Sequence, residues 1–156
     1  MTGPRIVHVV DDEAVVRRTL VGLLHECGYD ARPYASGTAF LDVAARLPFG
    51  CILLDLRMPD RSGLEVQAEL ARRGIGLPIV FLSGHGDLAT AVMAMKRGAV
   101  DFLEKPVREE ALLAVLDAVF RRREAADVDA ERARLVRRRI DAMTPREREV
   151  IRLVAD

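Results

Sequence analysis

The chain has 156 residues and half of them are apolar, so it is long enough to bury the core of one domain of ordinary size. Its 24 basic and 24 acidic residues cancel, which argues against a nucleic-acid or membrane bias of the chain as a whole. No apolar run has the length of a membrane span, and no signal peptide opens the chain. We therefore expect a cytoplasmic protein with no membrane partner.

The charges and the cysteines add two further expectations. Residues 1–120 carry 16 acids and 13 bases, whereas residues 121–139 carry eight Arg against four acids. Cys27 and Cys51 lie in apolar surroundings with no metal-like spacing. We expect both to be buried, reduced thiols, as in a cytosolic protein.

Strands and helices alternate five times along the chain. Short apolar runs predict strands over residues 5–10, 30–35, 51–55, 78–82 and 100–104. Helical patterns occupy roughly residues 14–27, 37–46, 63–73 and 88–97, and a fifth begins near residue 108. This alternation at short spacing predicts right-handed crossovers and a parallel sheet covered on both faces.

Several helix ends are also predicted. Ser36 and Asp87 stand at N-cap positions, and Gly28 is suited to stop the first helix. The apolar stripe of that first helix is formed by Val15, Val16, Leu20, Leu23 and Leu24.

Polar side chains stand where the strands end. Asp11 and Asp12 follow the first strand, Asp55 closes the third, Ser83 follows the fourth and Lys105 follows the fifth. The carboxyl ends of parallel strands meet at one edge of a sheet, where ligands bind. We therefore expect these five side chains to converge.

Such a group suits phosphoryl transfer to a carboxylate. Close carboxylates need a compensating cation, and a hard divalent ion such as Mg²⁺ (or Mn²⁺) is suited to them. A carboxylate can attack phosphorus to form an aspartyl phosphate, while a metal and an ammonium neutralise the phosphoryl oxygens. The chain offers Asp11 and Asp12 for the metal, Asp55 for the attack, Lys105 as the cation and Ser83 as the hydroxyl.

Simpler interpretations exist for these residues taken singly. Residues 11–13 would also serve as the cap and first-turn acids of the next helix, and Lys105 would also fit as a solvated residue before a loop. Lys105 is nevertheless informative, because the chain uses Arg 22 times and Lys only twice. A compact ammonium suits a single phosphoryl oxygen better than a planar guanidinium does.

Four motifs together resemble the receiver domain of two-component response regulators over about residues 5–120. They are Val10-Asp11-Asp12-Glu13, Leu53-Leu54-Asp55-Leu56-Arg57-Met58-Pro59, Leu82-Ser83-Gly84 and Glu104-Lys105-Pro106. The resemblance implies an α/β, flavodoxin-like, doubly wound (βα)5 fold with a five-stranded parallel sheet in the order 2-1-3-4-5. It also implies a receiver whose only chemistry is its own phosphotransfer and dephosphorylation, and not a conventional enzyme.

The resemblance assigns the acidic residues to phosphate and metal. Asp55 becomes the phosphoacceptor. Asp11 and Asp12 hold Mg²⁺ (or Mn²⁺), with Asp12 the more direct ligand, and Asp55 and the backbone carbonyl of Arg57 complete the protein ligands. The phosphoryl donor is then a sensor histidine kinase.

The remaining roles follow from the same resemblance. Ser83, where Thr is more frequent, is the switch hydroxyl, and Lys105 contacts the phosphoryl group through a segment whose bond to Pro106 is expected to be cis. Phe102 occupies the aromatic switch position, although core packing alone would also explain it. Arg57 and His85 occupy two variable positions that influence the lifetime of the phosphate; for His85 the alternative is a solvated loop residue.

A subgroup is indicated by residues 83–87 together with residues 91–99, which resemble the FixJ type (NarL/FixJ) of receiver. Such receivers commonly form a homodimer on phosphorylation through the fourth helix and the fifth strand. Val92 and Lys96 would lie near that face, although ordinary packing would also account for Val92.

The second half of the chain predicts a helical linker and the start of another domain. Residues 107–144 contain neither Gly nor Pro, which favours one helix of about 30 residues and about 45 Å. A thin apolar seam could pair in a dimer, and a solvated basic linker is the alternative. Thr144, Pro145 and Glu147 form a capping box that resembles the opening of a LuxR-type helix-turn-helix domain.

These patterns divide the chain into a receiver at residues 1–122, an Arg-rich linker at 123–142 and a truncated helix-turn-helix start at 143–156. We expect DNA binding only in a full-length parent protein, since no recognition helix follows. The prediction is a phosphorylation-dependent regulator of transcription. Two alternatives stay open: a constitutive dimerisation module insensitive to phosphate, and an aspartyl-phosphate phosphatase, which would need an acid where Arg57 stands.

Overall fold

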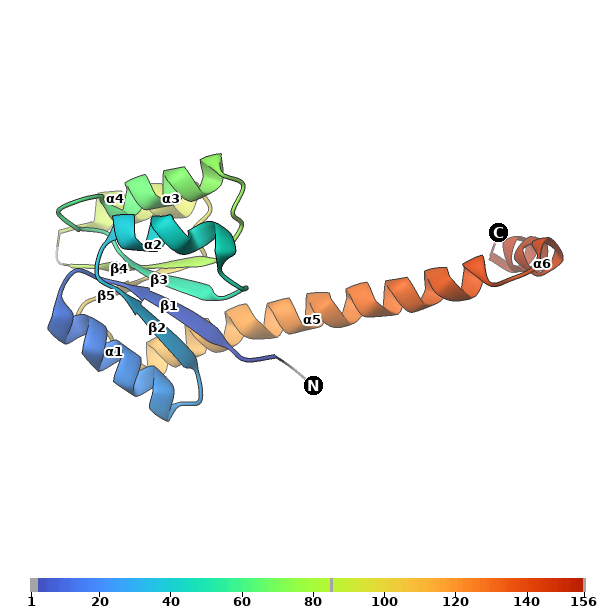
Figure 1. Cartoon of the computed structure of the whole chain (residues 1–156), viewed down its shortest axis with the longest axis horizontal. Coiled ribbons are helices and arrows are strands. Elements are labelled where there is room, and N and C mark those ends of the chain that lie inside the picture. Colours follow the sequence, from blue (N-terminus) through green and yellow to red (C-terminus); the bar gives the residue numbers. More distant parts are fainter. Residues whose placement is uncertain (1–2, 85, 156) are drawn as a thin grey trace. The chain divides into compact units, whose positions relative to one another are not determined.

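The computed structural model describes residues 3–84 and 86–155. Strands and helices alternate along the chain (Figure 1). The strands are β1 (Ile6–Val10), β2 (Asp30–Tyr34), β3 (Cys51–Asp55), β4 (Ile79–Ser83) and β5 (Asp101–Glu104). The helices are α1 (Ala14–Glu26), α2 (Gly37–Val43), α3 (Gly63–Arg72), α4 (Leu88–Lys96), α5 (Glu109–Asp141) and α6 (Pro145–Ala155), and a 3-10 turn, η1 (Ala44–Arg46), follows α2. The strands and helices begin and end within one or two residues of the predicted positions. The exception is the predicted helix over residues 37–46, whose last three residues form the 3-10 turn.

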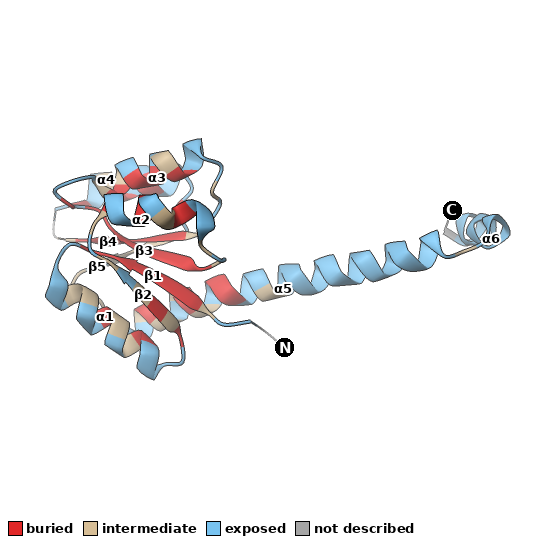
Figure 2. Ribbon diagram, viewed as in Figure 1, coloured by how far each residue is buried: buried red, intermediate tan, exposed pale blue. Residues whose placement is uncertain are grey.

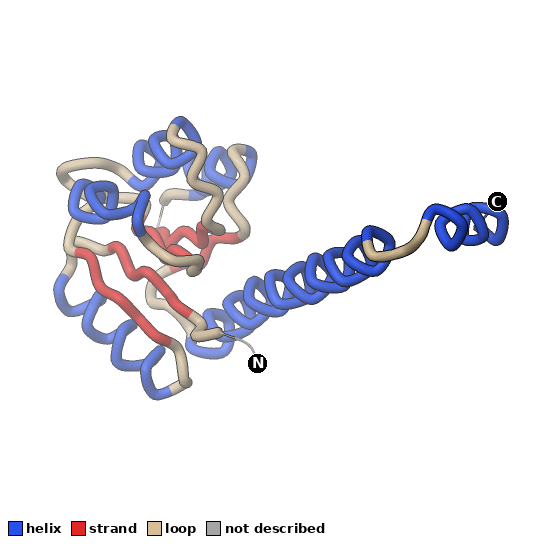
Figure 3. The backbone as a smooth tube through the Cα atoms, turned by 45° about the vertical axis from the view of Figure 1, so that its right-hand side comes forward, coloured by secondary structure: helices blue, strands red, loops and turns tan. Residues whose placement is uncertain are grey.

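All neighbouring strands pair in parallel, and the sheet order is β2-β1-β3-β4-β5. Helix α1 and the beginning of α5 cover one face of the sheet, and α2, α3 and α4 cover the other (Figures 1 and 3). This confirms the predicted doubly wound α/β fold. The order of the chain reverses beside β1 and β3, and a ligand site is therefore expected at their carboxyl ends.

The three central strands are buried at every position (Figure 2). Helices lie on both faces of β1, β3 and β4, so these strands are mostly apolar on both sides, and their polar residues are His8 and the strand-end residues Asp55 and Ser83. The continuous apolar run of β3 is therefore a consequence of its central place. Edge strand β5, by contrast, has no buried residue.

Two predicted helix ends are confirmed and one is wrong. Ser36 Oγ accepts a hydrogen bond from the Ala39 N–H, and Gly28 ends α1 with a φ of 88°. Asp87 occupies the N-cap position of α4, but its side chain makes no capping hydrogen bond. Its carboxylate is used elsewhere, as described below.

Two predicted burial assignments are also wrong. Val15 is 69% exposed, because at 3.6 residues per turn it lies away from the face of α1 that carries the half-buried Val16 and the buried Leu20 and Leu24. Cys27 is exposed at the C-terminal end of α1, whereas Cys51 is buried in β3 and burial raises the pKa of its thiol to about 12. The prediction of a buried thiol thus holds for Cys51 alone.

The chain divides into two compact units, Met1–Val119 and Phe120–Asp156. Helix α5 runs through 33 residues without a break, as predicted, and an ion pair joins Arg123 to Asp127 at 3.2 Å. The predicted capping box of α6 is confirmed. Thr144 N–H donates to Glu147 Oε1 at 2.9 Å, and Glu147 N–H donates to Thr144 Oγ1 at 3.3 Å.

No helix among residues 3–84 and 86–155 combines the length and apolar character needed to cross a bilayer.

Candidate functional site

Three carboxylates meet at the carboxyl edge of the sheet. Residue Val10 of β1 pairs in register with Leu54 of β3, so Asp11 and Asp55 follow at the same level on neighbouring strands. One carboxylate oxygen from each of Asp11, Asp12 and Asp55 lies within 4.8 Å of the other two. Asp11 and Asp55 are buried and Asp12 is exposed, so the cluster opens to solvent on the Asp12 side.

Local hydrogen bonds fix the two buried carboxylates. Asp11 Oδ1 accepts the Glu13 N–H at 2.9 Å, and the Arg17 guanidinium donates to the Asp11 backbone carbonyl at 2.7 Å. Asp55 Oδ1 accepts the Arg57 N–H at 3.2 Å. Each carboxylate is therefore held by the loop that directly follows its strand, which leaves its second oxygen for other partners.

A close backbone approach behind Asp55 requires glycine at position 63. A Cβ atom at Gly63 would lie 2.5 Å from the Asp55 carbonyl oxygen and 2.9 Å from the Phe81 ring. The Gly63 N–H also donates to the Leu56 carbonyl at 2.9 Å. The first residue of α3 thus packs directly against the end of β3, and this residue was not singled out from the sequence.

Lys105 completes the cluster from the far side of β4. Its ammonium lies 3.1 Å from Asp11 Oδ2, 3.3 Å from Asp55 Oδ2 and 3.8 Å from Glu13 Oε1. The Lys105 N–H donates to the Ser83 carbonyl at 2.7 Å, and the peptide bond to Pro106 is cis, as expected. The predicted convergence of Asp11, Asp55 and Lys105 is therefore confirmed.

The electrostatics of the site follow from burial and crowding. Burial, and next the neighbouring Asp11 carboxylate, raise the pKa of Asp55 to about 6, although Lys105 opposes the rise. Burial acts to lower the pKa of Lys105, but the Asp11 and Asp55 carboxylates outweigh it and raise that pKa. One ammonium does not fully compensate the acids around it, so the site favours a further cation.

The donor set fits a hard divalent metal ion. Asp11 Oδ2 is buried and forms an ion pair with the Lys105 ammonium. Among the described residues, it accepts no hydrogen bond. Carboxylate and carbonyl oxygens are the ligands that Mg²⁺ prefers. The acidic triad Asp11, Asp12 and Asp55 could thus bind a metal ion at its solvent-facing side.

The two predicted switch residues lie beside this edge. Ser83 is buried as the last residue of β4, one position beyond Leu82, which pairs with Asp55. Phe102 pairs with Phe81 in the sheet and packs, half-buried, against the core beneath α3 and α4. Core packing thus accounts for part of the environment of Phe102.

An ion pair that the sequence did not indicate connects the loops after β3 and β4. Arg57 Nε donates to Asp87 Oδ1 at 2.6 Å, and Arg57 Nη2 contacts the same oxygen. The Arg57 guanidinium holds the pKa of Asp87 below its usual value. The other variable position, His85, lies outside the described residues.

Comparison with known proteins agrees with this geometry. The family model for the response regulator receiver domain matches residues 7–117. The chain belongs to the response regulator receiver family. Receiver domains are not conventional enzymes, so membership of this family argues against the phosphatase alternative. A phosphatase of that type also needs an acid where this chain has Arg57.

Similar receivers come from longer regulators. The chain is 38% identical to the response regulator protein TmoT of Ectopseudomonas mendocina over 149 residues, which cover 96% of this chain and 68% of TmoT. It is 38% identical to the transcriptional regulatory protein FixJ of Bradyrhizobium diazoefficiens over 97% of this chain and 74% of FixJ. The structure of full-length FixJ from B. japonicum superposes with a TM-score of 0.77 at 37% identity, over 99% of this chain and 76% of that one. The receiver is thus of the FixJ type, and its membership of a two-component system implies a cognate histidine kinase.

Proposed function

We propose that this receiver takes a phosphoryl group from the phosphohistidine of a sensor histidine kinase onto Asp55 and thereby controls transcription from the cytoplasm. The observation that carries the proposal is the position of the Lys105 ammonium, 3.3 Å from Asp55 Oδ2 and 3.1 Å from Asp11 Oδ2. A buried nucleophilic carboxylate, a cation beside it and a second acid for a metal are what phosphoryl transfer requires.

The transfer itself needs little from the protein beyond position and charge. An Asp55 carboxylate oxygen attacks the phosphorus as the bond from phosphorus to the imidazole nitrogen breaks, and the electron pair returns to the imidazole. The Arg57 N–H keeps the other Asp55 oxygen in place at 3.2 Å. The Lys105 ammonium neutralises negative charge on a phosphoryl oxygen, and it is already placed between Asp55 and Asp11.

Asp11, Asp12, Asp55 and the Arg57 carbonyl would hold Mg²⁺ or Mn²⁺. When bound, this ion would neutralise the acids and the transferred phosphoryl charge. Asp12 is exposed and is the residue through which the ion would enter, while the buried Asp11 lacks a full set of partners for its second oxygen.

The phosphoryl group would then act on Ser83 and Phe102. Ser83 is buried at the end of β4, next to the strand that carries Asp55, and its hydroxyl would donate to a phosphoryl oxygen. Phe102 lies across from Phe81 on the adjacent strand and would move further inward as the loop after β4 tightens. The change would reach the surface formed by α4, β5 and the start of α5.

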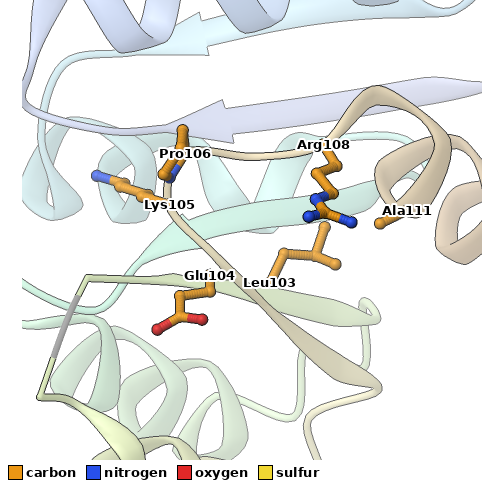
Figure 4. A pocket seen from close by; sticks show the side chains of 6 residues that line it. All are labelled: Leu103, Glu104, Lys105, Pro106, Arg108 and Ala111. Carbon is orange, nitrogen blue, oxygen red and sulfur yellow. The ribbon is translucent and has the colours of Figure 1, made fainter.

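Exposed apolar residues on that surface support its proposed role as a homodimer face. Val92 and Met93 of α4 are 44% and 45% exposed, and Lys96 lies exposed on the same helix. A pocket of about 400 Å³ adjoins it, in which the Lys105 side chain extends away from the Arg108 guanidinium (Figure 4). Its lining comes from Leu103, Glu104, Lys105, Pro106, Arg108 and Ala111. Exposed apolar residues beside a polar rim are typical of protein interfaces.

Residues 123–142 would connect this receiver to an output domain, and residues 143–156 would open a LuxR-type helix-turn-helix domain. The capping box at Thr144 and the similarity to longer transcriptional regulators such as FixJ support this division. The exposed Val128, Leu135, Val136 and Ile140 of α5 could pair between two copies of the linker.

Acetyl phosphate with Mg²⁺ provides the direct test of the acceptor. The intact protein should gain the mass of one phosphoryl group, Asp55→Asn should gain none, and EDTA should abolish the gain. Labelling of Asp55→Asn to the same stoichiometry would exclude Asp55 as the acceptor.

Beryllofluoride, which mimics a phosphoryl group, separates a phosphorylation switch from a constitutive dimer. Sizing the protein by light scattering should show monomers that become dimers when beryllofluoride and Mg²⁺ are added. Val92→Asp should keep the bound mimic but prevent the dimer. A dimer of unchanged size with and without the mimic would favour the constitutive module.

A further inference from the structure

The ion pair of Arg57 and Asp87 combines one very exposed and one buried charge. The side chain of Arg57 is 76% exposed, whereas that of Asp87 is 3% exposed. The guanidinium can therefore leave with little loss of packing. The Asp87 carboxylate, by contrast, is covered in this arrangement, with the guanidinium on its Oδ1.

Asp87 is tied to the loop that follows Ser83. Its Oδ2 accepts the Gly84 N–H at 3.2 Å, and its backbone carbonyl accepts the Ala91 N–H at 2.8 Å in the first turn of α4. The side chain thus spans from the residue after Ser83 to the beginning of α4. Among the described residues, Arg57 supplies the charged contacts to Asp87.

Arg57 is equally tied to Asp55, because its N–H donates to Asp55 Oδ1 at 3.2 Å. A phosphoryl group on Asp55 would therefore arise beside the backbone of Arg57. That group carries a charge of about −1.5 to −2, which exceeds the single charge of Asp87, and its oxygens suit a guanidinium. The two anions compete for one cation.

We propose that Asp87 competes with a phosphoryl group on Asp55 for the Arg57 guanidinium. Asp87 thus acts on the phosphorylation site through the position of Arg57. It holds the Arg57 guanidinium at the start of α4 in the unmodified protein, and the phosphoryl group on Asp55 draws that guanidinium away. The inference rests on the proposed function, since it requires Asp55 to accept the group.

The exchange has a consequence for α4. When Arg57 leaves, the Asp87 carboxylate loses its guanidinium partner and, among the described residues, keeps the hydrogen bond from the Gly84 N–H; a little-exposed carboxylate without a countercharge is unfavourable. Asp87 must then move or find solvent, and the first turn of α4, whose Ala91 N–H donates to the Asp87 carbonyl, moves with it. Occupation of Asp55 is thereby coupled to the first turn of α4 through a contact separate from Ser83 and Phe102.

Affinity for beryllofluoride in the presence of Mg²⁺, measured by calorimetry on the whole chain, tests the competition. Asp87→Asn retains an oxygen for the Gly84 N–H but no longer competes for Arg57. It should tighten binding by at least about threefold, the size of a modest coupling between neighbouring groups. In an Arg57→Gln background the same change should have no effect beyond that of removing a negative charge.

The matched control is Asp60→Asn, which likewise neutralises one carboxylate; Asp60 lies in the loop after β3, and its carboxylate accepts the Thr38 N–H. Its effect corrects for the general gain in anion affinity when a negative charge is removed. An Asp87→Asn effect equal to this control, or equal in both Arg57 backgrounds, would overturn the inference. Failure of the unaltered protein to bind beryllofluoride would overturn the proposed function and the inference together.

A measurement on the unaltered protein covers the case in which Asp87→Asn does not fold. The Nε–H resonance of Arg57 in a ¹⁵N spectrum, identified by its loss in Arg57→Gln, should shift when beryllofluoride and Mg²⁺ bind. An Arg57 Nε–H resonance that does not shift while the mimic saturates Asp55 would show that Arg57 stays paired with Asp87. That result would overturn the inference.

Discussion

The Lys105 ammonium lies 3.3 Å from Asp55 Oδ2 although Lys105 follows β5 and Asp55 ends β3, and β4 separates these two strands. The long lysine side chain crosses the end of β4 to reach a carboxylate that is 4% exposed. The same ammonium lies 3.1 Å from Asp11 Oδ2. One cation thus compensates two buried acids, and the stability and the chemistry of the site depend on it.

Removal of that cation should destabilise the metal-free protein. Lys105→Met leaves Asp11 and Asp55 without their ammonium, so the free energy of unfolding in urea with EDTA at neutral pH should fall by about 1–3 kcal/mol, less than for a fully buried pair because Lys105 is 20% exposed. Lys96→Met removes the only other lysine, which is exposed on α4. This variant should change the free energy of unfolding by less than about 0.5 kcal/mol. Equal stability of the two variants would contradict this account.

The raised pKa of Asp55 predicts a pH-dependent cost to folding. The pKa is about 6 in the folded chain against a usual 3.8, so the ionised side chain opposes folding fully above pH 6 and not at all below 3.8. Asp55→Asn should therefore be more stable than the unaltered protein by on the order of 2 kcal/mol at about pH 7.5 in EDTA.

The difference between these two proteins should shrink towards zero as the pH falls to about 4, where Asp55 is protonated in the folded state. Urea unfolding across this range measures it. Asp42→Asn, which neutralises an exposed acid of α2, is the control for the loss of one negative charge. A difference for Asp55→Asn that is constant with pH would show that its pKa is not raised.

Magnesium should stabilise the folded chain through the acidic triad. At a free Mg²⁺ concentration of about ten times the Kd, binding adds about 1.4 kcal/mol, which raises the Tm by a few degrees. Asp12→Asn should lose this rise because the exposed member of the triad is neutralised. Asp42→Asn should retain it, and an undiminished rise in Asp12→Asn would place the ion elsewhere.

The close approach at Gly63 should not tolerate a methyl group. Gly63→Ala places a Cβ 2.5 Å from the Asp55 carbonyl oxygen and 2.9 Å from Phe81, so we expect a loss of about 1–3 kcal/mol and slower labelling by acetyl phosphate. Gly22→Ala lies within α1 with nothing within 4 Å and should stabilise by up to about 1 kcal/mol. Urea unfolding compares the two, and an equally stable Gly63→Ala would mean that α3 moves away without cost.

Local pattern was sufficient for the strands, the helices and the identity of the acids. The apolar run before Asp55 predicts a strand buried on both faces because only a central parallel strand has neighbours above and below it. Val15 was misassigned because an apolar residue next to the stripe need not lie on its face, and Cys27 was misassigned because it follows the last residue of α1. The role of Asp87 was missed because an acid before a helix suits an N-cap whatever cation lies near it.

The sequence by itself determined the order of strands and helices and the residues that end each strand, since both follow from spacing along the chain. Only the tertiary structure decided which of these residues touch. The parallel sheet brings Lys105 to Asp55 and Asp11, and the packing of α3 on the end of β3 makes Gly63 obligatory. The loops after β3 and β4 bring Arg57 to Asp87, across thirty positions of sequence. Contacts of this kind depend on where two loops meet in space, and no local pattern records that.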